Sequence, residues 1–325
     1  MKRNAPHPFA PRRLLLASLF ALGLGSQAQA QQLVRIVVPF GAGAVQDTVA
    51  RTFSNELAQE LGATVIIENK AGAGGTVGTA QVAKAAPDGT TLVMAAASQH
   101  LAGYLYTKLP YDPNKDFVGV SYVGRTGYVV GVPTASGIQS IPDLIARAKK
   151  APETLFYASA GNGSASHLAT ASLAAQAGVK LQHVPTKSTG DATTELLAGR
   201  VQVVTGASIG MLAFEKDPRI KLLAYTGKAR SRFLPHLPTV AEAGVPGYAF
   251  DSWMGLLAPA ATPHATVERI NNAMVKVLAQ PAVQERLARV GIEAGSLPSA
   301  DFQKLLNADW AASEQIVKSA NIRIE

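Results

Sequence analysis

The sequence predicts an α/β protein with two similar halves. Three observations support this prediction: short β-branched runs alternate with amphipathic helical patterns, the alternation starts again near residue 128, and loops of small residues follow several of the strands. Such alternation predicts βαβ units, and therefore a parallel sheet with helices on both faces. A late strand pattern at 252–258 could return to the first half. We therefore expect one domain, residues 31–128 and 250–325, to be interrupted by a second, residues 129–249.

The first half shows these patterns most clearly. A β-branched run predicts a strand at 34–38 that ends at Pro39. The helix expected at 47–61 has its apolar residues spaced for one face, and these are Val49, Ala50, Phe53, Leu57 and Leu61. The other elements expected in this half are strands at 64–67 and 91–95 and a short helix at 79–85.

The second half repeats the arrangement, and the chain then becomes mainly helical. Strands are expected at 128–132, 155–158, 182–184, 201–205 and 221–225. Helices are expected at 141–149, 167–177 and 191–198, and Pro142 suits the first turn of the first of these. After the strand at 252–258, the patterns predict helices at 266–278, 283–290 and 302–319.

The N-terminus has the three parts of a secretory signal peptide. An apolar run of 12 residues, Leu14–Gly25, lies between basic residues and the sequence Ala28-Gln29-Ala30. The run is too short to span a bilayer, which takes about 20 residues. We therefore expect residues 1–30 to be cleaved after Ala30 and the protein to be exported to the periplasm. The remaining 295 of the 325 residues are enough for two domains.

The composition argues against several classes of function. The formal charge of +8 falls to +4 without the signal peptide, which carries four positive charges. The remaining basic residues are scattered, so nucleic-acid binding is not expected. The absence of cysteine excludes thiol catalysis and cysteine-ligated metals, and the six histidines are too far apart in sequence to suggest a zinc site. We expect no metal and no cofactor.

Enzyme motifs are also missing. The sequence has no His-Glu-x-x-His, no phosphate-binding P-loop and no Gly-x-Ser-x-Gly. Gly41 and Gly43 resemble the start of a dinucleotide fingerprint, but Gln46 stands where the third glycine belongs. Ser164 and His167 are spaced for a nucleophile–base pair, which would indicate a hydrolase. We favour the alternative, in which the serine begins a helix and the histidine fixes a loop, and we expect no enzyme activity.

Three loops of small residues follow strands, at 40–46, 72–78 and 159–164. In open α/β sheets, ligands bind beyond the carboxyl ends of the strands. The first turn of the next helix has free N–H groups and a partial positive charge, which suit an anion, and small side chains let a ligand approach this backbone. Asp47 either caps the helix that follows the first loop or accepts a ligand amine, and we favour the cap.

Strings along most of the chain resemble one family, the Bug family of extracytoplasmic receptors for tripartite tricarboxylate transporters. The matching strings are Val38-Pro39-Phe40, Asp47, Ala50-Arg51, Glu68–Gly75, Gly78, Val82–Gly89, Gly161–Ser164, His167-Leu168, His183–Lys187, Leu237–Gly244 and Ser252-Trp253. The resemblance implies a two-lobed, Venus-flytrap periplasmic binding fold. It also implies a small carboxylate ligand (a dicarboxylate, an acidic amino acid or an aromatic carboxylate), which such receptors bind largely through backbone amides and water.

The resemblance further implies partners and site residues. The partner would be a membrane permease or, alternatively, a sensor protein, and the receptor would act as a monomer. The ligand-binding residues on the side of the first half would be Phe40, Gly41, Gly43, Ala44, Val45, Asp47 and Ser98. Those on the side of the second half would be Ser159, Gly161, Asn162, Gly163, Ser164, His167, Thr186, Lys187 and Ala207.

Two positions depart from the family pattern. The family usually has a glycine pair where this chain has Gly43-Ala44, so a methyl group lies where the backbone should approach the ligand. The family motif His-Val-Pro-Tyr-Lys-Gly has Thr186 in place of the tyrosine and Ser188 in place of the glycine. Neither departure changes the fold or the general function that the resemblance implies.

Overall fold

The computed structural model describes Met1 and residues 32–162, 164–186 and 188–320 of the 325-residue chain. Residues 2–30 of the predicted signal peptide and its cleavage site lie outside these residues, as do the predicted site residues Gly163 and Lys187. Within the described part of the chain, no helix combines the length and apolar character needed to span a membrane.

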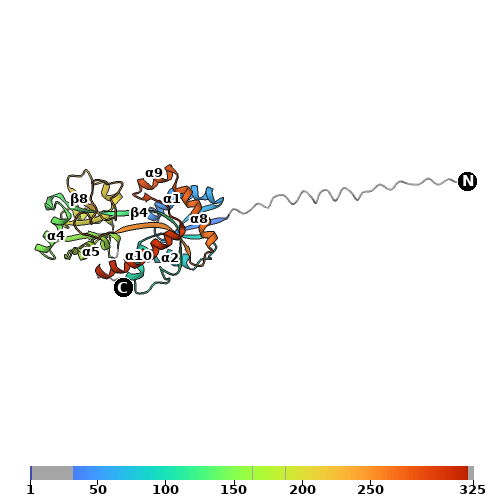
Figure 1. The fold of residues 1–325 in the computed structure, drawn as a ribbon, viewed down its shortest axis with the longest axis horizontal. Helices are drawn as coiled ribbons and strands as arrows, with labels where there is room; N and C mark the ends of the chain where they lie inside the picture. The colour runs from blue at the N-terminus through green and yellow to red at the C-terminus, as the bar shows by residue number, and fades with distance from the viewer. Residues whose placement is uncertain (2–31, 163, 187, 321–325) are drawn as a thin grey trace.

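Two lobes share one curled sheet (Figure 1). In the first lobe the strands lie in the order β2-β1-β3-β9-β4-β10. Their bounds are β1 Leu33–Val38, β2 Thr64–Asn69, β3 Thr91–Ala96, β4 Phe117–Pro133, β9 Asp251–Pro259 and β10 Glu293–Ala294. β1 pairs with β2 and β3 in parallel, whereas β9 and β10 pair with their neighbours antiparallel.

The second lobe has the strand order β6-β5-β7-β4-β8. The bounds are β5 Phe156–Ser159, β6 Gln182–Pro185, β7 Val203–Ala207 and β8 Ile220–Tyr225. β5 pairs in parallel with β6 and β7, and β4 is antiparallel to both β7 and β8. Each lobe therefore has a parallel part with antiparallel strands next to it.

Helices pack on both lobes. Those of the first lobe are α1 Val45–Leu61, α2 Thr76–Ala83, α3 Ser98–Leu105, α8 His264–Leu278, α9 Pro281–Arg289 and α10 Ser299–Ala320. Those of the second lobe are α4 Ile141–Lys150, α5 Ala165–Gln176, α6 Thr189–Leu197 and α7 Ser208–Leu212. Two short 3₁₀ turns, Ala73–Gly75 and Thr134–Ser136, complete the described elements. The C-terminal helix α10 contacts α3 of the first lobe and α5 of the second.

The expectation of a parallel sheet is wrong at the centre of the molecule. β4 is 17 residues long, whereas the sequence predicted only residues 128–132 as a strand. Its first part pairs with β9, and its last part, from Tyr128, pairs with β7 and β8. β4 and β9 connect the lobes, and because the chain crosses in one direction and later returns, these two strands are antiparallel. The helices α3 and α7 were not predicted.

The chain passes between the lobes near Tyr128 and again near Phe250, and the buried residue Thr226 joins these two places. The backbone N–H of Thr226 donates to the carbonyl of Tyr128 (2.9 Å), and that of Phe250 donates to the carbonyl of Thr226 (2.8 Å). The Thr226 hydroxyl accepts the N–H of Tyr128 and donates to the carbonyl of Phe250, both at 2.8 Å. Thr226 is completely buried, so it links β4 to the start of β9 where the chain passes between the lobes.

The apolar cores follow the lobes, with one exception. Phe53, Leu57 and Leu92 belong to a core cluster of the first lobe, around β1, β3 and α1. A cluster of the second lobe includes Leu101 and Leu105 of α3, which starts directly after β3, together with Val317 of α10. These helices therefore bury apolar side chains against the second lobe, and they join the lobes in addition to the crossing strands.

Candidate functional site

A pocket of about 360 Å³ lies between the two lobes. Its volume is at the small end of the range for ligand sites, roughly 300–1,000 Å³. The first lobe contributes Phe40, Gly74, Ser98, Ala102, Leu105 and Tyr106. The second lobe contributes Ala160, Asn162, Ser164 and Ala165. The pocket thus lies beyond the carboxyl ends of β1, β3 and β5, where an α/β sheet places its ligands.

Four of the predicted ligand residues line this pocket: Phe40, Ser98, Asn162 and Ser164. The others that the structure describes do not line it. Those in the first lobe are Gly41, Gly43, Ala44, Val45 and Asp47. Those in the second lobe are Ser159, Gly161, His167, Thr186 and Ala207. Several of them instead hold the pocket loops in place.

Asp47 orders the loop between β1 and α1. One of its carboxylate oxygens accepts the backbone N–H of Gly43 at 2.9 Å. The other accepts from Arg51 (3.0 Å) and from the side-chain amide of Asn69 (2.9 Å), which also donates to the carbonyl of Phe40. The hydrogen bond from Arg51 is the largest influence that lowers the pKa of Asp47, to about 2. Asp47 is therefore ionised and has partners within its own lobe, in keeping with the cap interpretation.

The backbone explains how Gly43-Ala44 is accommodated. Gly43 has φ +83°, a left-handed conformation that favours glycine. Ala44 has φ −63° and ψ 160°, which any L-residue adopts. The methyl group that distinguishes this chain from the family pattern is therefore placed without backbone strain.

Ser159 orders the loop between β5 and α5. Its hydroxyl lies 2.7 Å from Nε2 of His183. The same hydroxyl lies 3.1 Å from both the N–H and the carbonyl of Gly161, accepting from the first and donating to the second. Gly161 has φ +111°. Ser159 is completely buried. His183 on β6 contacts the loop through the Ser159 hydroxyl, and neither residue is among those that line the pocket.

Two histidine rings stack beneath this loop. The centroids of the His167 and His183 rings are 3.8 Å apart and the rings are nearly parallel. The Tyr157 ring lies beside both, 4.9 Å from His183 and 6.1 Å from His167. Burial, and then the neighbouring His183, lower the pKa of His167 to about 4, and burial lowers the pKa of His183. Both rings are therefore neutral at pH 7, and a stack of neutral rings avoids the repulsion of two imidazolium ions.

Ser164 and His167 meet as a helix cap. The Ser164 hydroxyl accepts the backbone N–H of His167 at 3.3 Å and lies 3.0 Å from the hydroxyl of Ser166. This contact orders the first turn of α5. Ser164 thus caps the start of α5, which is the role that the sequence analysis favoured for this serine.

The departures at Thr186 and Ser188 also have structural roles. The N–H and the hydroxyl of Thr186 both donate to the carbonyl of Ser159, at 2.9 and 2.8 Å. Ser188 caps α6, because its hydroxyl accepts the N–H of Asp191 and donates to the Asp191 carboxylate. Both residues stabilise the β6–α6 segment next to the pocket loop.

Many of the loop amides already have partners. The N–H groups of Gly43, Ala44, Ala160, Gly161 and Ser164 all donate within the protein. In the described part of the chain, the N–H groups of Asn162 and Ala165 have no such acceptor. Both residues line the pocket.

Six pocket residues were not among the predicted site residues: Gly74, Ala102, Leu105, Tyr106, Ala160 and Ala165. Gly74 and Ala160 fall in the small-residue loops that the sequence singled out. Ala102 and Leu105 belong to α3, which was not predicted, and Tyr106 follows it directly. Ser98, the first residue of α3, was a predicted site residue and pointed to this segment.

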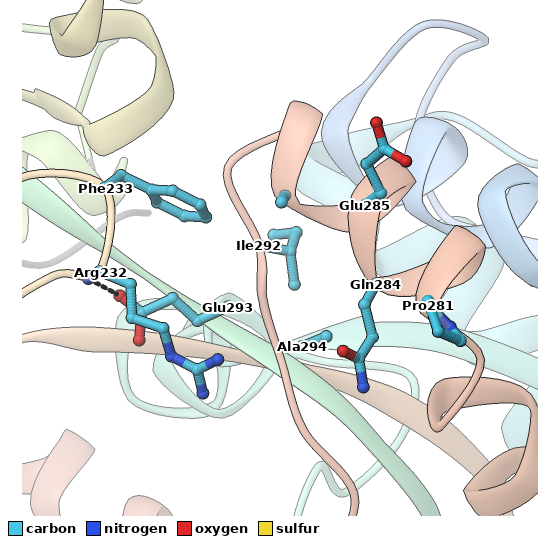
Figure 2. Close-up of a pocket in the computed structure, with 9 residues that line it drawn as sticks. Arg232, Phe233, Pro281, Gln284, Glu285, Ile292, Glu293 and Ala294 are labelled. Carbon is cyan, nitrogen blue, oxygen red and sulfur yellow. Dashed lines mark hydrogen bonds between the residues drawn. The ribbon is translucent and has the colours of Figure 1, made fainter.

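A second cavity, of about 490 Å³, lies at the other edge of β4. Figure 2 shows Arg232 and Phe233 on one side of it and residues of α9 and β10 on the other. Glu293 joins the two sides: one carboxylate oxygen accepts the N–H of Arg232 at 3.0 Å (Figure 2), and the other accepts two bonds from Arg125 at 3.1 Å. Arg125 also lies 3.8 Å from Asp251, whose pKa is raised by burial. This charged cluster marks the region where the lobes meet.

Among the described residues, no three histidine, cysteine, aspartate or glutamate side chains are grouped to hold a metal ion.

The family model of the tripartite tricarboxylate transporter family receptor, TctC, matches residues 49–322. The chain belongs to this family. The resemblance to the Bug receptors is thereby confirmed, and the protein is a solute-binding protein of the TctC/Bug type. The family is one of substrate-binding receptors, not of enzymes.

Relatives of this receptor cover most of its length. A protein of Pseudomonas sp. (strain P51), named for the tcbD-tcbE intergenic region, is 36% identical over 310 residues, which is 92% of each chain. Protein BugT of Bordetella pertussis is 32% identical over 260 residues, covering 79% of this chain and 80% of BugT.

Solved structures show the same two-lobed fold. Rpa4515 of R. palustris, solved with adipate, has a TM-score of 0.76 and 32% identity, covering 90% of this chain and 98% of its own. MatC of Rhodopseudomonas palustris, solved with malate, has a TM-score of 0.72 and 31% identity, covering 88% and 98%. The expected periplasmic binding fold is confirmed.

Proposed function

We propose that this protein is an exported receptor that captures a small carboxylate between its lobes and delivers it to the permease of a tripartite tricarboxylate transporter. The observation that carries the proposal is a pocket formed by both lobes, with two free backbone amides at its second-lobe loop. A carboxylate bound there would contact the N-terminal turn of α5, where the helix dipole favours negative charge.

The strand pairing supports a division of the chain into two lobes. We propose that residues 31–128 and 250–325 form the first lobe and residues 129–249 the second, with cleavage after Ala30 releasing the chain into the periplasm. Both sides of the described pocket come from one chain, which is compatible with a receptor that acts as a monomer. Two structural relatives were solved with dicarboxylates, adipate and malate, which supports a carboxylate as the class of ligand.

A thermal-shift screen tests the proposed ligand class. The protein purified after export would be heated with a panel of carboxylates, including dicarboxylates, acidic amino acids and aromatic acids, and with sugars and amines as controls. A ligand at 100 times its Kd stabilises the fold by about 2.7 kcal/mol, which raises Tm by roughly 5 °C. Stabilisation by sugars or amines alone would contradict the proposal.

The transport role needs a separate measurement. Uptake of the labelled ligand would be compared between cells with and without the gene for this receptor. Loss of uptake is the expected result. Unchanged uptake, together with a changed transcriptional response to the ligand, would instead assign the receptor to a sensor protein.

A further inference from the structure

The cavity lined by Arg232, Phe233 and residues of α9 and β10, here called the α9 cavity, is separate from the pocket of the proposed function. Its volume of about 490 Å³ lies within the range for ligand sites, roughly 300–1,000 Å³. It shares no lining residue with the pocket of about 360 Å³, which we call the first pocket. A molecule bound in the α9 cavity would therefore be a second ligand.

Most of the lining of the α9 cavity is apolar. Five of its nine lining residues are Phe233, Pro281, Ala288, Ile292 and Ala294. Phe233 is partly buried and its ring points toward Ile292, which is only 1% exposed (Figure 2). Ligand sites are lined mainly by hydrophobic and aromatic side chains with a few polar groups, and the α9 cavity has this composition.

The charges at the α9 cavity leave one cation without a counter-ion. Each of the two carboxylates in the lining pairs with an arginine from outside it: Glu285 with Arg289 at 2.6 Å, and Glu293 with Arg125 at 3.1 Å. Arg232 contributes only its backbone N–H to Glu293. In the part of the chain that the structure describes, its guanidinium has neither an ion pair nor a hydrogen bond, so an anion bound there would not have to displace a carboxylate of the protein.

The polar side chains are also arranged for an anion. In Figure 2 the guanidinium of Arg232 and the side-chain amide of Gln284 extend toward the same end of the cavity, whereas the carboxylate of Glu285 extends toward the other end. A guanidinium binds a carboxylate through two parallel, charge-assisted hydrogen bonds, and the amide of Gln284 can donate another. One end of the cavity is therefore suited to a carboxylate.

We propose that the α9 cavity is a second ligand site, which binds a small organic acid with its carboxylate on Arg232 and its ring or alkyl body against Phe233 and Ile292. The site is formed by residues of both lobes, because Arg232 and Phe233 follow β8 whereas Ile292 precedes β10. This proposal goes beyond the proposed function and does not depend on it, because it uses no residue of the first pocket.

A residue-resolved NMR titration of ¹⁵N-labelled protein, purified after export, tests the proposal with benzoate and with benzamide, which has nearly the same shape but no charge. Benzoate should shift the amide signals of Phe233 and Ala294 saturably, with a Kd on the order of millimolar for so small a ligand. Because benzamide lacks the charge-assisted bonds, its Kd at the same signals should be higher by about tenfold or more. The absence of a saturable shift, or equal binding of the two probes, overturns the proposal.

The same spectra keep the two sites apart. Benzoate shifts confined to signals of the first pocket, such as Ser98 and Asn162, overturn the second site but support the proposed function. Shifts at Phe233 and Ala294 with none at the first pocket support the second site, and the carboxylate panel then decides the proposed function.

A pair of arginine variants gives the complementary test. Arg232→Gln removes the cation and keeps the backbone N–H that Glu293 accepts, so the benzoate Kd at the cavity signals should rise by about tenfold or more. Arg230→Gln is the matched control, because Arg230 lies two residues earlier, is exposed and already pairs with Glu242 at 2.9 Å. It should leave the Kd unchanged. An unchanged Kd in Arg232→Gln, or an equal rise in both variants, overturns the proposal.

Discussion

Asp47 shows how a polar residue next to a binding pocket can act on it without lining it. Sequence alone left two roles open, a helix cap and a contact to a ligand amine. In the structure both oxygens of the carboxylate have partners in the first lobe, and one of these is the N–H of Gly43. The side chain fixes the path of the loop that carries Phe40 and is only 3% exposed.

Replacement of Asp47 by asparagine should therefore disturb both stability and binding. Asp47→Asn leaves Arg51 without its carboxylate, and we expect the free energy of unfolding to fall by about 1–3 kcal/mol, with weaker ligand binding. Asp143 is a matched control, because it accepts the N–H of Gln139 and pairs with Arg147 at the same spacings on the exposed surface of α4. Urea denaturation should show a change of about 0.5 kcal/mol or less for Asp143→Asn. Equal losses in the two variants would contradict this account.

The histidine stack predicts a loss of stability in mild acid. The folded pKa of His167 is lowered to about 4 from the 6.5 of a free histidine. The unfolded chain therefore takes up a proton first as the pH falls. The stabilisation is fully present above pH 6.5 and is lost as the pH falls toward 4, by up to about 3 kcal/mol.

Melting curves between pH 7.5 and 4.5 test this prediction. His167→Phe keeps an aromatic ring against His183 and Tyr157 but cannot titrate, so its Tm should fall less than that of the wild type over this range. His264→Gln changes an exposed histidine on α8 and should leave the wild-type slope. A slope unaffected by His167→Phe would mean that other groups set the acid sensitivity.

The residues of the pocket were only partly accessible to sequence reasoning. Phe40, Ser98, Asn162 and Ser164 lie at the ends of strands, where small-residue loops or the family strings drew attention to them. Tyr106 and Leu105 could not be found in this way, because their place in the pocket depends on how α3 packs between the lobes. That packing is a long-range contact with the second-lobe core.

For helices and strands, the hydrophobic patterns of the sequence predicted the element correctly where one of its faces is buried. α1 and the strands β1, β2 and β3 begin and end within three residues of their predicted bounds. β4 was mostly missed because glycines interrupt its apolar pattern. Those glycines are required by distant neighbours: a Cβ at Gly127 would lie 2.3 Å from the Tyr225 ring, and one at Gly124 would lie 2.6 Å from the carbonyl of Glu293.

The charged cluster on β4, β9 and β10 should contribute to stability. Glu293 is 5% exposed and is the nearer carboxylate partner of Arg125. In Glu293→Gln, Arg125 keeps only the more distant Asp251, so we expect a loss of about 1–3 kcal/mol in unfolding free energy. Glu285→Gln is the control on the neighbouring helix α9, because Glu285 forms an exposed pair with Arg289. Similar denaturation midpoints for Glu293→Gln and the wild type would contradict the prediction.

The two-lobed plan of the whole molecule could be anticipated, but its central sheet could not. The restart of the βα pattern indicated two halves, and the late strand pattern at 252–258 indicated a return to the first half. The antiparallel pairing of β4 with β9 joins residues more than a hundred positions apart. Local periodicity carries no information on such a pairing. The expected parallel sheet was therefore right only for the pairs among β1, β2 and β3 and among β5, β6 and β7.

Shared elements should make the lobes unfold together. β4 lies in the sheets of both lobes, and α3 and α10 bury apolar residues in the second-lobe core. Differential scanning calorimetry of the ligand-free protein should therefore show one transition, with equal calorimetric and van't Hoff enthalpies. Two resolved transitions would mean that each lobe is stable alone.

Thr226 has a consequence for how such a receptor moves. Its backbone and hydroxyl groups bond to Tyr128 at one crossing and Phe250 at the other, away from water. The two connections therefore cannot bend independently, because separating them would leave several buried polar groups without partners. We expect the lobes to have a single rotational degree of freedom about this point. If the proposed ligand closes the lobes, this link would confine the closure to rotation about Thr226.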